Sequence, residues 1–316
     1  MSLRYRLFTH NDLDGVGCSI ALKSMYNATF NVNFCNYHEI NDQITDFFKS
    51  GEYEQYDRLF ITDIGITVDT ANLIQAHVSR EHIPVFMVDH HPTNLNLNHY
   101  EFCNILPNHN NGMKSSATSL LLELLIYEKG VPVSSKLKQF SEIVRKYDTW
   151  DWQRIGDIVP KRYNDLLTII GLERFEKLML NLILDESTQD LELPYAENMM
   201  IEIHEEEVSR YILDASRRLV KTVIDGHKVG VVFAERFASK LGNDLCKMHP
   251  DIDYVMIINL NYENISLRAT REDIHVGEIS KALFGGGGHA QAAGAQLSRE
   301  DVLRIQNVVT GHVQYV

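Results

Sequence analysis

The stretch HNDLDG, at residues 10–15, places potential metal ligands at alternate positions directly after an apolar run. These ligands are His10, Asp12 and Asp14. In an extended segment, residues two apart point to the same face, so one imidazole and two carboxylates would converge at the end of a strand. Such a concentration of negative charge is unfavourable unless a cation neutralises it. The stretch therefore raises the hypothesis of a metal site.

Three other interpretations have to be compared with this one. Taken alone, NDLDG is more typical of a helix cap or a turn, because Asn and Asp favour both. An EF-hand loop needs further oxygen ligands and a Glu at its twelfth position, whereas DLDGVGCSIALK turns apolar. An aspartyl-phosphate phosphatase, with its nucleophilic Asp in a similar Asp-x-Asp-Gly after a strand, remains open at this point.

Two further apolar runs also end in residues of ligand type. LFITDIG ends at Asp63, and VFMVDHH ends at Asp89, His90 and His91. Each alone has an ordinary explanation, as a turn residue or as surface or core histidines. In open α/β sheets, however, sites form at the carboxyl ends of strands. The joint occurrence favours a site, and it weakens the phosphatase alternative, which has no use for an adjacent pair of histidines.

The mixture of His and Asp indicates which metal such a site would hold. It suits Mn²⁺ best, with Mg²⁺ as the alternative, and no thiolate is present to favour zinc. The ligands are too many for one ion. A two-metal centre needs a bridging carboxylate and a separation of about 3.5–4 Å, and it positions and deprotonates a water for in-line attack on phosphorus. Asp63, on the middle segment, is the natural bridge.

The order of these motifs resembles the DHH phosphoesterase superfamily. HNDLDG, TDIG and VDHH are similar to its first three motifs, and VRKYDTW supplies Asp148 for the fourth. FGGGGHAQAAGAQL, far downstream, resembles the Gly-Gly-Gly-His motif of the associated DHHA1 domain. Five ordered motifs span nearly the whole chain, so the resemblance is specific. Within the superfamily, the contexts DTW and SSATSLL look most like the nanoRNase B type of oligoribonuclease.

The resemblance implies a role for each residue of these motifs. One metal would be held by His10, Asp12 and Asp63, and the other by Asp14, Asp63, His90 and Asp148. Asp89 would orient a histidine, and His91 would stabilise the phosphoryl group. Only Asp148 depends on the resemblance alone for its identification.

The second half of the chain offers candidate substrate contacts. Gly285–Gly288 could approach an anion closely with their amides, and His289 could contact the scissile phosphate. Within this run, Gly286, Gly287 and Gly288 are the predicted phosphate contacts, although a glycine run alone is more typical of a turn. The resemblance implies a substrate contact for Arg268. Ser116 begins a helix and is a weaker candidate, because capping alone explains it.

The composition sets limits on the partners. The chain has 316 residues, 44% of them apolar, and a formal net charge of −13. This acidity argues against a long nucleic-acid footprint but not against a short substrate whose phosphates metal ions neutralise. No window of about 18 apolar residues predicts a membrane span, and the N-terminus lacks an apolar signal-peptide core. Four scattered cysteines favour a reducing cytoplasm.

Elements that position these residues follow from the apolar patterns, which predict an α/β fold. Strands alternate with helices in the first half, which indicates a parallel sheet covered on both faces. The predicted strands are 5–10, 32–37, 58–65, 83–91, 227–235, 253–260, 264–270 and 292–298. The predicted helices are 17–26, 41–49 with Asn41 as cap, 69–80, 115–130, 134–147, 162–184, 196–223, 238–249, 276–284 and one at the C-terminus.

The pattern divides the chain into a large α/β domain at residues 1–187, a helical connector at 188–222 and a smaller α/β domain at 223–316. The resemblance implies that the first is the DHH catalytic domain and the last the DHHA1 substrate-binding domain. The resemblance implies a cytoplasmic two-metal phosphodiesterase that degrades short RNA or dinucleotides to 5′-mononucleotides, 3′-to-5′ by analogy. The alternatives are hydrolysis of 3′-phosphoadenosine 5′-phosphate, of linear or of cyclic dinucleotides. A family II inorganic pyrophosphatase and a non-catalytic nucleotide-binding module are two more. The oligomeric state stays open, with a homodimer as one alternative.

Overall fold

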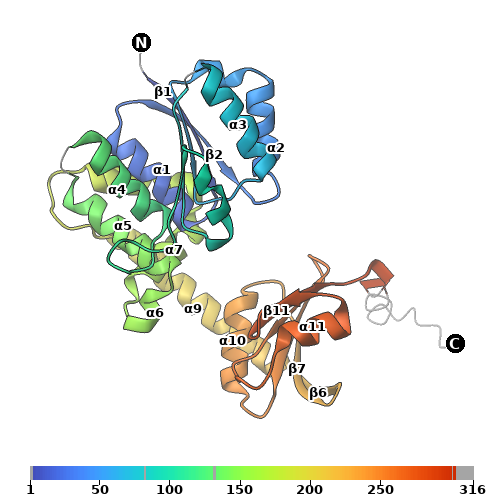
Figure 1. Ribbon diagram of the computed structural model, residues 1–316. Helices are drawn as coiled ribbons and strands as arrows, with labels where there is room; N and C mark the ends of the chain where they lie inside the picture. Colours follow the sequence, from blue (N-terminus) through green and yellow to red (C-terminus); the bar gives the residue numbers. More distant parts are fainter. Residues whose placement is uncertain (1–2, 82, 131–132, 301, 304–316) are drawn as a thin grey trace. The chain divides into compact units, whose positions relative to one another are not determined.

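The computed structural model describes residues 3–81, 83–130, 133–300 and 302–303 (Figure 1). The chain divides into two compact units, Met1–Ile201 and Glu202–Val316. The division falls inside one long helix, α9, which runs over Tyr195–Arg218. Among the described residues, no helix combines the length and the apolar character that crossing a membrane requires.

The first unit is built on a parallel sheet of five strands. These are β1 (Arg4–His10), β2 (Thr29–Cys35), β3 (Arg58–Thr62), β4 (Val85–Asp89) and β5 (Cys103–Ile105). Their order across the sheet is β2-β1-β3-β4-β5. The strand order therefore reverses between β1 and β3, and in such sheets the crevice for ligands forms at the carboxyl ends of the two strands that flank the reversal.

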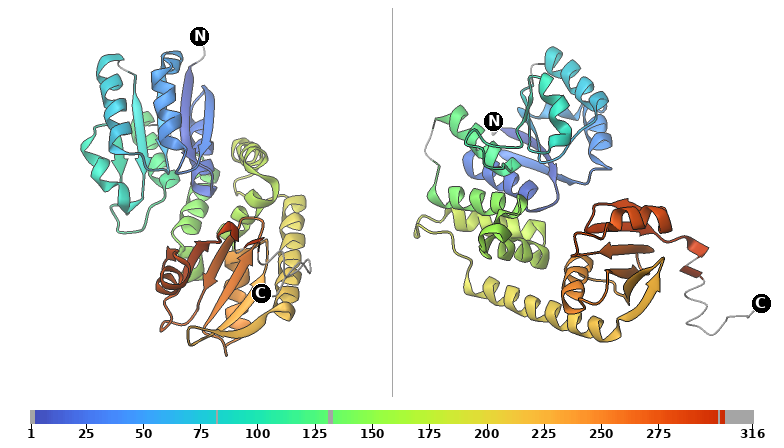
Figure 2. Two further views of the ribbon diagram at one scale, coloured as in Figure 1. Left: turned by 90° about the vertical axis from the view of Figure 1, so that its right-hand side faces the viewer. Right: turned by 60° about the horizontal axis from the view of Figure 1, so that its bottom comes forward.

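Helices cover both faces of this sheet (Figure 2). On one face lie α2 (Ile40–Lys49) and α3 (Val68–Glu81). On the other face α1 (Leu13–Met25) and α4 (Ala117–Lys129) pack against the strands. A further layer of helices packs against α1: α5 (Ser135–Asp148), α7 (Val159–Ile170) and α8 (Leu172–Leu184). Because the inner strands β3 and β4 pack between two apolar layers, their sequences are near-continuous apolar runs. The α/β class predicted from sequence is confirmed.

Several boundaries differ from the predicted ones. Asn41 does not cap α2 but lies in its first turn, where its side-chain oxygen accepts hydrogen bonds from Thr67 in the loop after β3 and from Thr70 in α3. The helix predicted over 162–184 is two helices, because Gly171 lies between them with φ 78° and ψ 164°. The short elements η1 (Glu52–Gln55), η2 (Pro92–His99), β5 and α6 (Asp151–Ile155) were not predicted. The C-terminal helix falls largely outside the described residues.

The second unit contains a mixed six-stranded sheet. Its strands are β6 (Val220–Ile224), β7 (His227–Phe233), β8 (Tyr254–Asn259), β9 (Asn264–Arg268), β10 (Gly287–Gly288) and β11 (Ala292–Gln296), in the order β10-β11-β9-β8-β7-β6. The helices are α10 (Ala238–Met248) and α11 (Val276–Phe284). The predicted helix over 196–223 ends at Arg218, and Val220–Ile224 instead pairs with β7 in an antiparallel hairpin.

Candidate metal centre

The candidate ligands come together at the carboxyl ends of β1, β3 and β4. Thr9 pairs with Thr62, and Thr62 pairs with Val88, so the residues that follow lie side by side at one edge of the sheet. These next residues are His10, Asp63 and Asp89. The sheet register thus explains why motifs that are far apart in sequence converge.

The first group of ligands consists of His10, Asp12 and Asp63. The Nδ1 atom of His10 lies 2.7 Å from Oδ2 of Asp12 and 3.9 Å from Oδ2 of Asp63. Asp12 also caps α1, since its Oδ1 accepts a 3.0 Å hydrogen bond from the Gly15 amide. A Cβ on Gly15 would lie 2.0 Å from the carbonyl oxygen of His10, so only glycine permits this close turn.

The second group consists of Asp14, His90 and Asp148. The Nε2 atom of His90 lies 3.7 Å from Asp14 Oδ2 and 3.4 Å from Asp148 Oδ2. Asp14 is held by the N-terminus of α4, where the amides of Ala117 and Thr118 donate hydrogen bonds of 2.6 and 2.8 Å to its two oxygens. The positive end of that helix dipole stabilises the ionised carboxylate.

Asp63 belongs to the first group and also lies beside His90 of the second. Its Oδ2 faces His10, and its Oδ1 lies 3.5 Å from Nε2 of His90. Its backbone adopts φ 58°, a left-handed conformation that is uncommon outside glycine. Among the described residues, the buried Oδ2 of Asp63 and Nε2 of His90 have no hydrogen-bond partner. Buried polar atoms without partners are energetically unfavourable, so these two atoms are suited to bind a cation.

The electrostatics of the cluster point the same way. Burial, together with Asp14 and Asp12, raises the pKa of Asp63 well above its usual range. Burial and the same two carboxylates raise the pKa of Asp148 to about 8. Burial also opposes the charge on Asp12, but hydrogen bonding to His10 prevails and lowers its pKa to about 2. Carboxylates and imidazoles without a thiolate fit two divalent cations of the Mn²⁺ or Mg²⁺ kind.

Asp89 is fully engaged by its neighbours. One carboxylate oxygen lies 2.7 Å from Nδ1 of His91, and the other accepts a 2.6 Å hydrogen bond from Nδ2 of Asn94. The hydrogen bond to Asp89 raises the pKa of His91. Burial works against ionisation of Asp89, but its bonds to His91 and Asn94 lower its pKa overall. Asp89 therefore fixes the orientation of the His91 ring, whose Nε2 remains free to act.

Ser116 lies at the first turn of α4. Its hydroxyl accepts from the Ser119 amide, and the Ser119 hydroxyl accepts in turn from the Ser116 amide, which is a capping box. Its side chain is buried, so capping explains this serine without a substrate.

The remaining candidates lie in the second unit. The Arg268 guanidinium donates to the carbonyls of Leu267 and Ala293 and to the Ser239 hydroxyl, and it has no carboxylate partner within the described chain. The Gly286 amide donates to Ser280 and the His289 amide to Ala292, so these two amides are already bonded inside the unit. Gly287 and Gly288 form β10 at the edge of the sheet and are exposed, as is His289.

Comparisons with known proteins agree with this geometry. The DHH family N-terminal domain matches residues 5–145, and the DHHA1 domain matches residues 234–313. Oligoribonuclease NrnB of Bacillus subtilis is 35% identical over 298 residues, which cover 94% of this chain and 73% of that protein. The chain belongs to the DHH family.

Solved structures show the same DHH fold at low identity. RecJ of Thermus thermophilus, in complex with Mn²⁺, has a TM-score of 0.57 and 14% identity over 98% of this chain and 52% of that chain. PggH from Vibrio, a pGpG-specific phosphodiesterase, has a TM-score of 0.54 and 17% identity over 98% of each chain. The family resemblance found in the sequence is confirmed by the two family models and by the identity to oligoribonuclease NrnB.

Some residues at the DHH site were not predicted. Tyr37, in the loop after β2, has its ring centre 4.8 Å from that of His10 and 6.4 Å from that of His91. Asn94 supports Asp89 from the start of η2. Asn94 follows the VDHH motif by three positions, which is the signal that could have revealed it. Tyr37 carries no such signal, because only the sheet topology brings it to the site.

Proposed function

We propose that this DHH protein is a phosphodiesterase that uses two divalent cations, with Mn²⁺ preferred, to hydrolyse short oligoribonucleotides to 5′-mononucleotides. The observation that supports this most is the convergence of five other candidate ligands around Asp63, which has one oxygen toward each group. Cations held there supply positive charge to a phosphodiester and lower the pKa of an attacking water. His10, Asp12 and Asp63 would hold one cation, and Asp14, Asp63, His90 and Asp148 the other.

The other residues of the site orient side chains or contact the phosphate in this proposal. Asp89 holds His91 so that its Nε2 can donate a hydrogen bond to a phosphoryl oxygen, where negative charge increases in the transition state. The second unit would contribute Arg268 and the segment Gly286–His289 as phosphate contacts. The proposed division is a catalytic domain at 1–187, a connector at 188–222 and a substrate-binding domain at 223–316.

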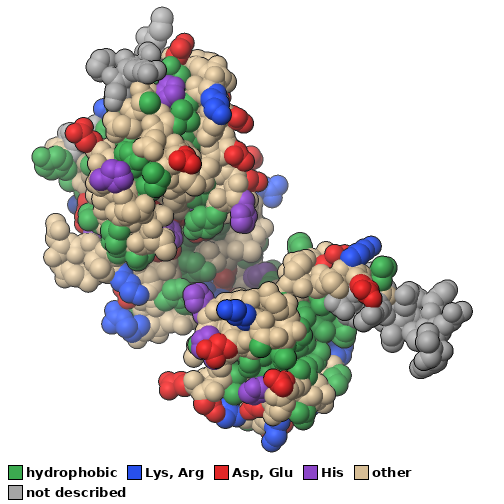
Figure 3. Space-filling view, turned by 45° about the vertical axis from the view of Figure 1, so that its right-hand side comes forward, with side chains coloured by type: hydrophobic (Ala, Val, Ile, Leu, Met, Phe, Trp, Pro, Cys, Tyr) green, Lys and Arg blue, Asp and Glu red, His purple; other side chains and the backbone are tan. Residues whose placement is uncertain are grey.

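Charge supports a short substrate. The net charge is −13, and on the face drawn in Figure 3 Lys and Arg side chains are interspersed with Asp and Glu and form no continuous band. Because each further phosphate needs a cationic partner, longer RNA gains little affinity. We propose a cytoplasmic location, which suits both RNA turnover and the four free cysteines.

The test is a length series of RNA substrates with Mn²⁺, with kcat and KM measured separately. We expect the highest kcat/KM for about two to five nucleotides, with 5′-mononucleotides released from the 3′ end. Chelation should abolish hydrolysis, and Mn²⁺ should restore it. Preference for long RNA, for pyrophosphate or for 3′-phosphoadenosine 5′-phosphate would contradict the proposed substrate, and full activity of metal-free protein would contradict the mechanism.

A further inference from the structure

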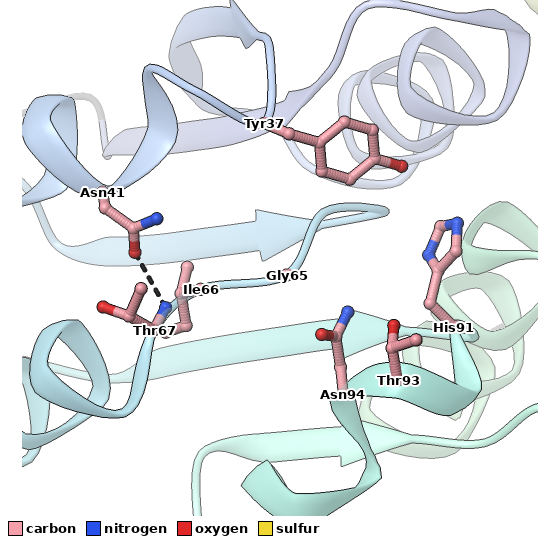
Figure 4. A pocket seen from close by; sticks show the side chains of 8 residues that line it. All are labelled: Tyr37, Asn41, Gly65, Ile66, Thr67, His91, Thr93 and Asn94. Carbon is pink, nitrogen blue, oxygen red and sulfur yellow. Dashed lines mark hydrogen bonds between the residues drawn. The ribbon is translucent and has the colours of Figure 1, made fainter. Parts of the chain in front are cut away.

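A cavity of about 370 Å³ opens beside the candidate metal centre, within the first unit (Figure 4). Its lining comes from four segments that meet at the carboxyl edge of the sheet: the loop after β2, the start of α2, the loop after β3 and the start of η2. The lining residues are Tyr37, Asn41, Gly65, Ile66, Thr67, His91, Thr93 and Asn94. His91 belongs to both the cavity and the site, so a molecule in the cavity lies next to the reacting phosphate.

An aromatic ring stands at the mouth of this cavity. Tyr37 is 50% exposed, and its ring contacts His10 at 4.8 Å between ring centres and lies edge-on to His91. Figure 4 shows Tyr37 and His91 projecting toward each other from different segments. One half of the Tyr37 surface therefore packs against the site, while the rest is available for a flat ligand.

The floor offers hydrogen-bonding groups with free capacity. Asn41 is held by its oxygen, which accepts from the Thr67 amide at 2.8 Å and the Thr70 hydroxyl at 2.9 Å. Its Nδ2 is therefore a hydrogen-bond donor at the cavity, and no other described residue accepts from it. Asn94 is held by its Nδ2 against Asp89, so its Oδ1 is left as an acceptor without a partner in the described chain.

The shape of the floor depends on the absence of a side chain at residue 65. A Cβ on Gly65 would lie 2.4 Å from Nδ2 of Asn94 and 2.5 Å from Oδ1. Such a contact would displace the Asn94 amide from its bond to Asp89. Glycine at position 65 therefore allows the Asn94 amide to keep its hydrogen bond to Asp89 and leaves the cavity open.

The lining selects the uncharged part of a nucleotide. His91 is its only ionisable side chain besides the Tyr37 phenol, so the cavity offers no lysine or arginine to a phosphate. A nucleobase presents a flat face to an aromatic ring and donors and acceptors at its edge to amides. We infer that this cavity is a nucleoside subsite, in which Tyr37 stacks on the base next to the scissile phosphate and Asn41 and Asn94 meet its edge. The inference rests on the proposed phosphodiesterase function.

The test compares a diribonucleotide with two analogues that lack either the 5′ or the 3′ base. For the wild-type protein, removal of the base that occupies the cavity should lower kcat/KM about tenfold, because stacking of one base is worth about 1–3 kcal/mol. Tyr37→Ala should lower kcat/KM about tenfold on the intact dinucleotide and on the analogue that keeps this base. On the analogue that lacks it, the same substitution should change kcat/KM by less than about twofold.

Two matched variants accompany this comparison. Tyr37→Phe keeps the stacking ring and should recover most of the kcat/KM that Tyr37→Ala loses on the substrates that carry the base. Tyr127→Ala removes an equally large ring that is 90% exposed on α4 and lines no part of the cavity, and it should change nothing. An equal loss for Tyr37→Ala on all three substrates would overturn the inference, because a merely structural role affects them alike.

A binding measurement separates this inference from the proposed function. Adenosine 5′-monophosphate, titrated into the full-length protein in chelator, should bind the wild type and Tyr37→Phe about tenfold more tightly than Tyr37→Ala. Ribose 5-phosphate should not distinguish the three. Failure to hydrolyse dinucleotides with this binding intact would contradict only the proposed function. Equal binding of the mononucleotide to all three proteins would contradict the subsite.

Discussion

At the scale of the residue, the site depends on the backbone of Asp63. A left-handed φ of 58° turns its two carboxylate oxygens toward different ligand groups. Asp and Asn tolerate this region better than other residues with a side chain. Asn at this position is therefore a suitable probe, because it removes the charge while keeping the conformation.

Asp63→Asn should reduce the proposed phosphodiesterase activity about 100-fold or more, because both cations lose a ligand charge and several kcal/mol of stabilisation. Calorimetric titration with Mn²⁺ should show weaker binding at both sites. Asp46→Asn, an exposed change on α2, should alter neither quantity. Two Mn²⁺ ions bound to Asp63→Asn with wild-type affinity would show that Asp63 is not shared.

Asp89→Asn tests the positioning role of the buried carboxylate. The His91 ring would lose a charged partner at 2.7 Å, and its orientation would no longer be fixed. Loss of such a partner usually costs about 10–100-fold in activity. We expect the loss in kcat rather than in KM, measured on a dinucleotide at saturating Mn²⁺. A rise in KM alone would assign Asp89 to ground-state binding instead.

Much of this site could be predicted from the sequence, for a physical reason. His10, Asp63 and the Asp89–His91 triplet each end an apolar run, so their shared edge follows from parallel pairing. Asp148 ends α5, and nothing local sets it apart from an ordinary helix-terminal Asp. Tyr37 is brought to the site only by the strand order, which no local pattern contains.

At the scale of the element, Arg145 forms hydrogen bonds that connect three segments. Its guanidinium donates to Glu142 on α5, to Asp151 on α6 and to the carbonyl of Lys114 before α4. The hydrogen bond to Arg145 lowers the pKa of Asp151. A carboxylate with a lowered pKa in the folded state stabilises the protein above its ordinary pKa, and this stability is lost as the pH falls through the lowered value.

Asp151→Asn should therefore lower the free energy of unfolding at neutral pH and flatten its decline below about pH 4. The measurement is urea unfolding of metal-free protein between about pH 3 and pH 7, analysed as the difference from the wild type. Asp244→Asn removes a pair with Lys240 on α10 that lies at the surface with Asp244 half-buried, and it serves as the control that should shift stability by less than about 0.5 kcal/mol. Parallel pH profiles for Asp151→Asn and the wild type would contradict the prediction.

Element boundaries were predicted less well than the elements themselves. Gly171 was included inside one helix, because the apolar periodicity continues across it, but its φ of 78° and ψ of 164° interrupt the hydrogen bonding. LVKTV was assigned to the helix before it. Its β-branched residues instead pair with β7, and tertiary pairing outweighed the local periodicity.

At the scale of the whole molecule, the proposed function divides the work between the two units. The candidate ligands all belong to Met1–Ile201, and the proposed phosphate contacts other than His91 belong to Glu202–Val316. Arg268→Ala should then raise KM for dinucleotides about tenfold, because a hydrogen bond to a charged group is worth about 1.5–3 kcal/mol. The affinity for Mn²⁺ should not change.

His289→Ala should act differently, by lowering kcat, if its ring contacts the phosphoryl group in the transition state. Arg299→Ala, an exposed change in the same unit whose partner is Glu263, is the matched control for both variants. Unchanged kinetics for Arg268→Ala and His289→Ala would remove the second unit from the proposed phosphate contacts.

The hydrogen bonds from the amides of Ala117 and Thr118 to Asp14 join parts of the chain that are more than 100 residues apart. An unfolded chain cannot gather these ligands, so a cation that binds them stabilises only the folded state. The melting temperature should then rise with the logarithm of free Mn²⁺ concentration and fall back in chelator. The proposed catalytic ions would thus also stabilise the fold of the first unit. Removal of the metal would increase the susceptibility of the protein to proteolysis and abolish its activity.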